Sequence, residues 1–208
     1  MAFLQESHIE NADINFFIEE LGYQHINAWE KQLIGRKNLK EVVLKDRLRA
    51  ALLRLNRHLS ESFDFAIIEL TKSHITHEPI GANKVIYELI KNGVAVTYKN
   101  ELGKEEIGFV KVLDYEDETQ NDFLVVSQLS IEYLNVGSST HRPDLLIYVN
   151  GLPLVMIELK NAKEKVKTGY DKNLSDYKQD IPQLFWYNLF VCKYLYIFSL
   201  NDFHTLRN

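Results

Sequence analysis

The feature that most constrains the fold of this chain is a pair of short apolar segments joined by Asn150-Gly151. The segments DLLIYV (144–149) and LVMIEL (154–159) are apolar at almost every position, and therefore on both faces of any strand that they form. Strands with this pattern lie in the middle of a sheet that is covered by helices on both sides. An Asn-Gly pair between two such segments is typical of a β-hairpin. The sequence therefore predicts a central β-hairpin over residues 141–160.

Charged side chains interrupt this apolar hairpin at its open end. Asp144 begins the first strand, and Glu158 and Lys160 end the second. Because side chains alternate along a strand, Glu158 and Lys160 lie on the same face of the second strand. Burying such groups is expensive unless they are paired or bind a metal ion. Two carboxylates offer the hard oxygen ligands that Mg²⁺ takes, and a lysine beside the metal can orient water or offset charge during phosphodiester hydrolysis. The pattern predicts a metal-dependent nuclease site. The alternative is a cross-strand ion pair near a strand end, with Asp144 capping a turn.

The pairing register of the hairpin provides a test of this prediction. With a regular two-residue turn, Asp144 would pair with Ile157 and would lie on the opposite face from Glu158. A shared site therefore requires an odd-length loop or a β-bulge near residues 150–152. A regular two-residue hairpin would count against the site.

The remaining hydrophobic pattern changes from a helical period to a strand period along the chain. Helices are expected over residues 8–21, 39–58, 60–74 and 79–92, near 169–179, and after Pro182. Strands are expected over residues 94–98, 107–115, 123–133, 144–149, 154–159 and 194–200. This order predicts an α/β fold with a mixed β-sheet flanked by helices. We expect one domain over residues 1–208, with a mostly helical part (1–92) and a core (93–208).

Composition excludes some classes of protein. The net charge of −5 argues against a protein that coats nucleic acid by bulk electrostatics. Residues 31–57 nevertheless carry nine lysines and arginines, which form either a local DNA contact or a solvated helix face. No apolar run is long enough to span a membrane, and we expect a cytoplasmic protein with no membrane partner. The single cysteine, Cys192, is expected to be a small buried hydrophobe rather than a reactive thiol.

The stretch RPDLLIYVNGLPLVMIELKNA resembles the nuclease motif of the R (restriction) subunit of type I restriction enzymes. Residues 39–56, 121–131 and 176–188 are similar to further segments of the same N-terminal region, so the resemblance covers essentially the whole chain. It implies a restriction-endonuclease-like PD-(D/E)xK core that cleaves double-stranded DNA with Mg²⁺. It also implies modification and specificity subunits as partners, and an ATP-driven translocase. ATP would act only in that translocase, because this chain contains no phosphate-loop motif.

The resemblance also implies roles for individual residues of the hairpin. Asp144 and Glu158 would bind the metal ion, and the carbonyl group of Leu159 could add a further ligand. Lys160 would assist the attacking water or stabilise the transition state, so that Asp144, Glu158 and Lys160 form the catalytic set. Apart from the resemblance, His141 precedes the motif and could contact phosphate or simply cap the strand, and Arg142 is a similar candidate.

Residues outside the hairpin are implied less directly. The family has a Gln-x-x-x-Tyr motif that corresponds to Asn173 and Tyr177, with asparagine in place of the usual glutamine, and both would position the substrate. An early acidic residue would complete the metal site; Glu10 is the first choice and Glu6 the alternative. The competing function is a catalytically silent domain of the same fold, which docks DNA or the other subunits.

Overall fold

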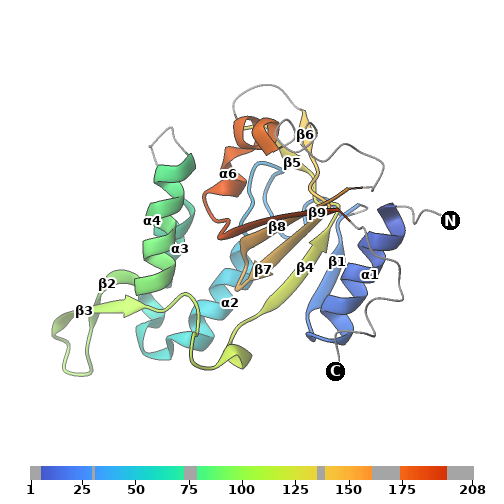
Figure 1. Ribbon diagram of the computed structural model, residues 1–208. Helices are drawn as coiled ribbons and strands as arrows, with labels where there is room; N and C mark the ends of the chain where they lie inside the picture. The colour runs from blue at the N-terminus through green and yellow to red at the C-terminus, as the bar shows by residue number, and fades with distance from the viewer. Residues whose placement is uncertain (1–5, 30, 73–78, 135–138, 161–173, 196–208) are drawn as a thin grey trace.

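The computed structural model describes residues 6–29, 31–72, 79–134, 139–160 and 174–195, and it is organised around a five-stranded mixed sheet (Figure 1). The strands lie in the order β1 (Gln24–Asn27), β4 (Phe123–Ser127), β7 (Leu145–Val149), β8 (Leu152–Lys160) and β9 (Phe190–Leu195). The two outer pairs, β1 with β4 and β8 with β9, are parallel, whereas β7 is antiparallel to both of its neighbours. The apolar hairpin therefore lies at the centre of the sheet, as its sequence predicts.

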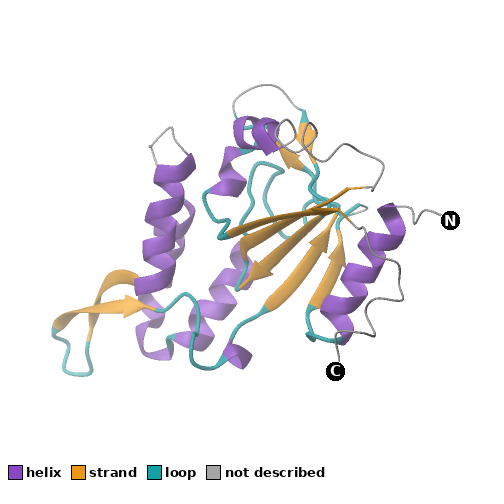
Figure 2. Ribbon diagram, viewed as in Figure 1, coloured by secondary structure: helices purple, strands orange, loops and turns teal. Residues whose placement is uncertain are grey.

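Helices cover both faces of this sheet (Figure 2). On one face, α1 (Glu6–Glu19) packs Ile9 and Ile14 into a cluster with Val125, Leu145, Ile147, Ile157 and Leu159, which we call the α1 cluster. The other face carries a larger cluster that includes side chains of α2 (Lys45–Leu55) and α6 (Pro182–Phe185). The expected α/β architecture, a mixed sheet flanked by helices, is confirmed.

The segment before α2 differs from its prediction. The helix expected over residues 39–58 begins only at Lys45, because the preceding chain binds to the tip of the hairpin. The N–H of Leu44 donates to the carbonyl oxygen of Gly151 at 2.9 Å. Val42, Val43 and Leu44 are buried in this non-helical segment. Their apolar pattern therefore reflects contact with the sheet and not a helix face.

The middle of the chain forms a helical layer and a hairpin outside the central sheet. It contains η1 (Arg57–Ser62), α3 (Phe63–Thr71) and α4 (Pro79–Asn92), followed by β2 (Val94–Lys99) and β3 (Glu105–Val110). These two strands pair only with each other in the described sheets, and Figure 1 shows them on the opposite side of the molecule from α1. The predicted strands exist, but they are not neighbours of the central hairpin.

Two short elements complete the fold near the site. After η2 (Glu118–Gln120) and β4, the strands β5 (Ile131–Glu132) and β6 (Thr140–His141) pair with each other. Residues 174–180 are helical and overlap the helix expected near 169–179, whose first part lies outside the described residues. β1 was not predicted, and it comes from the part of the chain that was expected to be mostly helical. The division into a part over residues 1–92 and a core over residues 93–208 stays a prediction.

Cys192 of β9 is exposed, so the expectation of a buried cysteine is wrong. No helix in the described ranges is long and apolar enough to cross a membrane.

Candidate active site

The central hairpin contains the irregularity that a shared site requires. Its turn is the two-residue Asn150-Gly151, with both residues in the left-handed region (φ 51° and 81°). Beyond the pair formed by Tyr148 and Pro153, the register shifts by one residue and leaves Leu154 as an extra residue on β8. The predicted bulge is therefore confirmed, but it lies within β8 and not in the turn. Pro153 explains its position, because proline cannot donate to the strand ladder and is tolerated in a sheet at bulges.

The bulge brings the two predicted carboxylates to the same face of the sheet. Beyond it, Leu145 pairs with Ile157, and both side chains lie in the α1 cluster. Asp144 and Glu158 are the next residues on their strands, so the alternation of side chains directs both toward the opposite face. One contact fixes this arrangement: the Asp144 Oδ2 atom accepts the N–H of Leu159 at 2.7 Å. Glu158 is 6% exposed, which makes it a buried carboxylate beside a second carboxylate.

Tyr177 faces both carboxylates from helical residues 174–180. Its hydroxyl oxygen lies 3.4 and 3.5 Å from the two carboxylate oxygens of Glu158. Burial raises the pKa of the Tyr177 hydroxyl, and the negative charges of Glu158 and Asp144 raise it further. The hydroxyl therefore stays protonated at neutral pH and directs its proton toward Glu158. The structure thus brings together Asp144, Glu158 and Tyr177.

Gln128, which the sequence analysis did not select, connects Glu10 to Asp144. The side-chain amide of Gln128 donates to both carboxylate oxygens of Glu10, at 2.9 and 3.0 Å. The backbone N–H of Gln128 donates to the carbonyl oxygen of Asp144 at 3.1 Å. Gln128 directly follows β4 in the left-handed region (φ 58°), which is uncommon for a residue with a side chain. Gln128 is one of several polar residues in the segment 123–133, so the sequence pattern did not distinguish it.

His141 packs its ring against the ring of Tyr177. Its ring lies 4.8 Å from the ring of Tyr133 and 4.6 Å from the ring of Tyr177, measured between centroids. Its Nε2 atom lies 2.8 Å from Oδ2 of Asp180, which belongs to the same helical segment as Tyr177. The partners Tyr133 and Asp180 could not be found from sequence, because they join the site only through tertiary packing.

Several predicted site residues are not placed by the structure. Lys160 ends β8 and Glu6 begins α1. The structure describes the backbone of these two residues but not their side chains. Asn173 lies outside the described residues. In the described ranges, no three His, Cys, Asp or Glu side chains are grouped as ligands of a metal ion. The role of Glu10 as a metal ligand therefore stays a prediction.

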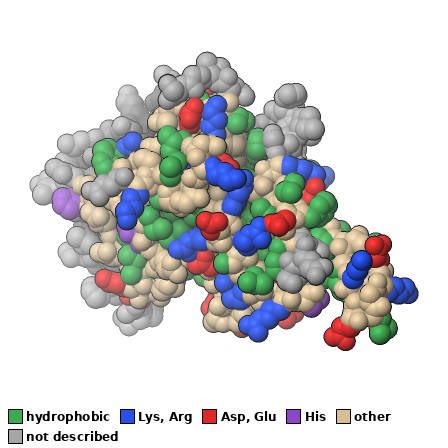
Figure 3. All heavy atoms as spheres, turned by 180° about the vertical axis from the view of Figure 1, so that it is seen from behind, with side chains coloured by type: hydrophobic (Ala, Val, Ile, Leu, Met, Phe, Trp, Pro, Cys, Tyr) green, Lys and Arg blue, Asp and Glu red, His purple; other side chains and the backbone are tan. Residues whose placement is uncertain are grey.

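The basic run over residues 31–57 is largely satisfied by this chain's own acceptors. Arg47 contacts Asp122 at 2.7 Å, and Arg54 donates to the carbonyl oxygen of Gln120 at 2.7 Å. Arg36 is 3% exposed and donates to four backbone carbonyl oxygens. Figure 3 shows acidic and basic side chains interspersed on the face seen from behind. These arginines stabilise the fold, so this part of the run is not an open basic surface.

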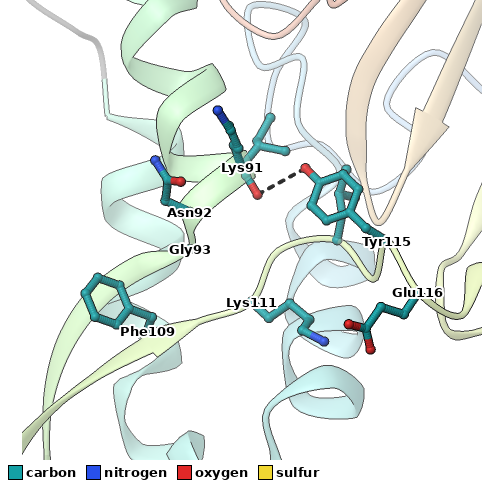
Figure 4. Close-up of a pocket in the computed structure, with 9 residues that line it drawn as sticks. Lys91, Asn92, Gly93, Phe109, Lys111, Tyr115 and Glu116 are labelled. Atoms are coloured by element: carbon teal, nitrogen blue, oxygen red, sulfur yellow. Dashed lines mark hydrogen bonds between the residues drawn. The ribbon is translucent and has the colours of Figure 1, made fainter.

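Two cavities lined by described residues lie apart from the predicted site residues. One of about 290 Å³ lies at the base of the β2–β3 hairpin, where the Tyr115 hydroxyl donates to the carbonyl oxygen of Ile90 at 3.3 Å (Figure 4). Another, of about 270 Å³, is lined by residues that include Val42, Gln183 and Trp186. None of the predicted site residues lines either cavity.

Comparison with known proteins identifies the family of the chain. Residues 3–207 match the family described as the type I restriction enzyme R protein N terminus. The chain belongs to this family. Within the R proteins, the type I restriction enzyme HindI endonuclease subunit of Haemophilus influenzae is 36% identical over 186 residues, which cover 82% of this chain and 17% of that protein. A protein of Methanocaldococcus jannaschii named as the MjaIXP endonuclease subunit of a type I restriction enzyme is 31% identical over 184 residues, which cover 86% of this chain and 17% of that protein.

The R-protein family membership confirms the resemblance seen in the sequence. A further relative, named as the MjaVIIIP endonuclease subunit of the same archaeon, is 25% identical over 194 residues, 92% of this chain. The chain spans 17–18% of the length of these relatives. It is therefore related to one region of a much longer type of protein.

Proposed function

We propose that this chain is the Mg²⁺-dependent nuclease domain of a type I restriction R subunit, with a PD-(D/E)xK fold, and that it cleaves double-stranded DNA. The observation that carries the proposal is the bulge at Leu154. A hairpin without this extra residue would direct Asp144 and Glu158 to opposite faces of the sheet. With it, both carboxylates lie on the face that Tyr177 covers. An ion pair that only stabilised a strand end would not require this register.

The residues present fit Mg²⁺. The carboxylates of Asp144 and Glu158 and the carbonyl oxygen of Leu159 are hard oxygen donors, and Mg²⁺ usually keeps several waters, so it requires few protein ligands. When bound, the ion would polarise the phosphate and lower the pKa of a coordinated water. The N–H of Leu159 holds Asp144 in place at 2.7 Å, and the Tyr177 hydroxyl restrains Glu158. Lys160 is the proposed group that orients water or offsets negative charge on the phosphate.

The test uses the full R subunit assembled with modification and specificity subunits, the partners that we propose for it. We expect Glu158→Gln to lower DNA cleavage by about 100-fold or more, since groups that stabilise transition-state charge contribute on that scale. Lys160→Ala should do the same. ATP hydrolysis and translocation, which we assign to the rest of the subunit, should persist in both variants.

Matched controls come from the exposed tip of the β2–β3 hairpin. Glu101→Gln and Lys104→Ala make the same chemical changes at residues that are exposed and distant from the sheet edge. Both control variants should cleave at the normal rate. If Glu158→Gln and Lys160→Ala also cleaved normally, the nuclease assignment would be wrong, and the competing function of a silent docking domain would replace it.

A further inference from the structure

Arg142, two residues before Asp144, is a cation that forms no ion pair within the described part of the chain. None of the ion pairs among described residues includes it. Its Nε atom donates to the Ser130 hydroxyl at 3.1 Å, and the described residues offer no hydrogen-bond acceptor to its two terminal nitrogens. Its guanidinium carbon lies 4.2 Å from the centroid of the Trp29 ring. Arg36 and Arg47 differ from Arg142, because their terminal nitrogens bind oxygens of this chain.

A chain of hydrogen bonds through Gln32 and Ser130 connects Trp29 to Arg142. The backbone N–H of Trp29 donates to the Asn27 side chain at 2.9 Å, and the Gln32 amide donates to the carbonyl oxygen of Trp29 at 2.8 Å. Gln32 in turn accepts the N–H of Ser130 at 3.0 Å, and Ser130 is the residue that binds Arg142. Trp29 is nevertheless 60% exposed. The pair is therefore fixed in position while its outer surface stays open to solvent.

The topology places this pair at the edge of the sheet where the carboxylates lie. β1 and β4 are parallel, so Asn27 and Ser127 end at the same edge, and Trp29 and Gln128 follow there. β7 is antiparallel to β4 and begins at that edge, directly after Asp144, whereas β8 ends there. Figure 1 shows the ends of β1 and β4 close together beside α1.

We propose that Arg142, oriented by Trp29, binds a backbone phosphate of the DNA strand next to the phosphodiester that is cleaved. This inference rests on the proposed nuclease function. Two clustered carboxylates repel a polyanion, and beyond the metal ion and Lys160 a further cation lowers this repulsion for the neighbouring phosphate. A guanidinium group that lies over an aromatic ring, and whose two terminal nitrogens are not bonded to described residues, offers paired donors that match the oxygens of a phosphate. Arg142 is thus a substrate-positioning residue, and Trp29 acts through it.

The test again uses the full complex, with cleavage and translocation measured on the same DNA at several KCl concentrations. We expect Arg142→Ala to lower the cleavage rate about 10-fold with translocation unchanged, and Arg142→Lys to recover part of the loss. Trp29→Phe should stay close to wild type, since it keeps an aromatic face, and Trp29→Ala should not. Loss of one phosphate contact should also make the plot of log rate against log salt less steep by about 0.9. Arg57→Ala, which removes an exposed arginine of η1, is the matched control and should change neither rate nor slope.

The outcomes separate this inference from the proposed function. If Glu158→Gln abolishes cleavage but Arg142→Ala leaves its rate and salt slope intact, the phosphate contact is wrong and the nuclease assignment stands. If Arg142→Ala lowers the rate with an unchanged slope, and Arg142→Lys recovers nothing, Arg142 is only structural, and the inference again fails. If Glu158→Gln cleaves normally, the proposed function itself fails.

Discussion

Asn150 is the residue whose replacement tests how the hairpin is held in register. It is fully buried at the turn, and its side chain makes four hydrogen bonds. Its Oδ1 atom accepts the N–H of Asp122 at 2.8 Å and a terminal nitrogen of Arg54 at 3.2 Å. Its Nδ2 atom donates to the carbonyl oxygen of Val112 and to the Asn121 side chain, both at 2.9 Å. The turn is therefore tied to the β3–β4 connection and to α2.

The cost of removing this side chain follows from the partners that it leaves behind. Asn150→Gly leaves the half-buried N–H of Asp122 and the buried carbonyl group of Val112 without this partner, at about 1–3 kcal/mol each, so about 2–6 kcal/mol in total. Glycine keeps the left-handed backbone of the turn without strain. Asn150→Ala loses the same bonds and adds left-handed strain of about 1–2 kcal/mol, which alanine's lower unfolded-state entropy partly offsets. Alanine should therefore be the more destabilising of the two by about 1 kcal/mol.

Equilibrium urea unfolding of the chain measures both differences. We expect both variants to lower the urea midpoint with an unchanged m-value, in the order wild type, Asn150→Gly, Asn150→Ala. A matched control is Asn100→Gly, which removes an exposed-loop asparagine that also bonds backbone N–H groups, at the tip of the β2–β3 hairpin. It should cost much less, because water replaces its bonds. A loss below about 1 kcal/mol for both Asn150 variants would refute the argument, since buried partners left unsatisfied cannot be that cheap.

Three further predictions concern the site, the turn and pH. Tyr177→Phe should fold with near-normal stability but cleave DNA about 10-fold more slowly, because it removes the hydroxyl group 3.4 Å from Glu158. Cleavage at the wild-type rate would show that the hydroxyl group has no role in the reaction. Gly151→Ala should cost about 2–5 kcal/mol in urea unfolding, because its φ is 81° and a Cβ would approach the carbonyl oxygen of Leu44 to 2.5 Å; a normal midpoint would contradict the turn geometry. Burial lowers the pKa of the His25 imidazole, so the unfolded state binds more protons below about pH 6.5 and stability should fall as pH falls through that region. His25→Gln should flatten this decline in thermal melts, and an unaltered decline would assign it to other groups.

The hairpin and its chemistry could be predicted locally. Apolar runs on both sides of an Asn-Gly turn require a central position in a sheet, and carboxylates within them require a compensating role, whatever the rest of the fold is. The need for a bulge also followed from counting residues between Asp144 and Glu158. Pro153 could have located it, because a proline inside a buried strand indicates where the hydrogen-bond ladder is interrupted.

Other features depended on contacts between residues far apart in the sequence. The pattern of 94–110 predicts strands but does not specify their neighbours, so the separation of the β2–β3 hairpin from the central sheet could not be seen. β1 is only four residues long and carries three polar side chains, and it is a strand because β4 offers it a parallel partner. Cys192 lies in an apolar run, yet it is exposed on β9, the last strand of the described sheet.

The sequence by itself determined the central hairpin, the need for an irregular register and the candidate catalytic residues, because alternation and turn chemistry act over a few residues. Only the tertiary structure brought Tyr177 against Glu158. It also stacked Arg142 on Trp29, 113 positions apart by their numbers in the chain. Such pairings are decided by which strands become neighbours and where they end, and no local pattern contains that information.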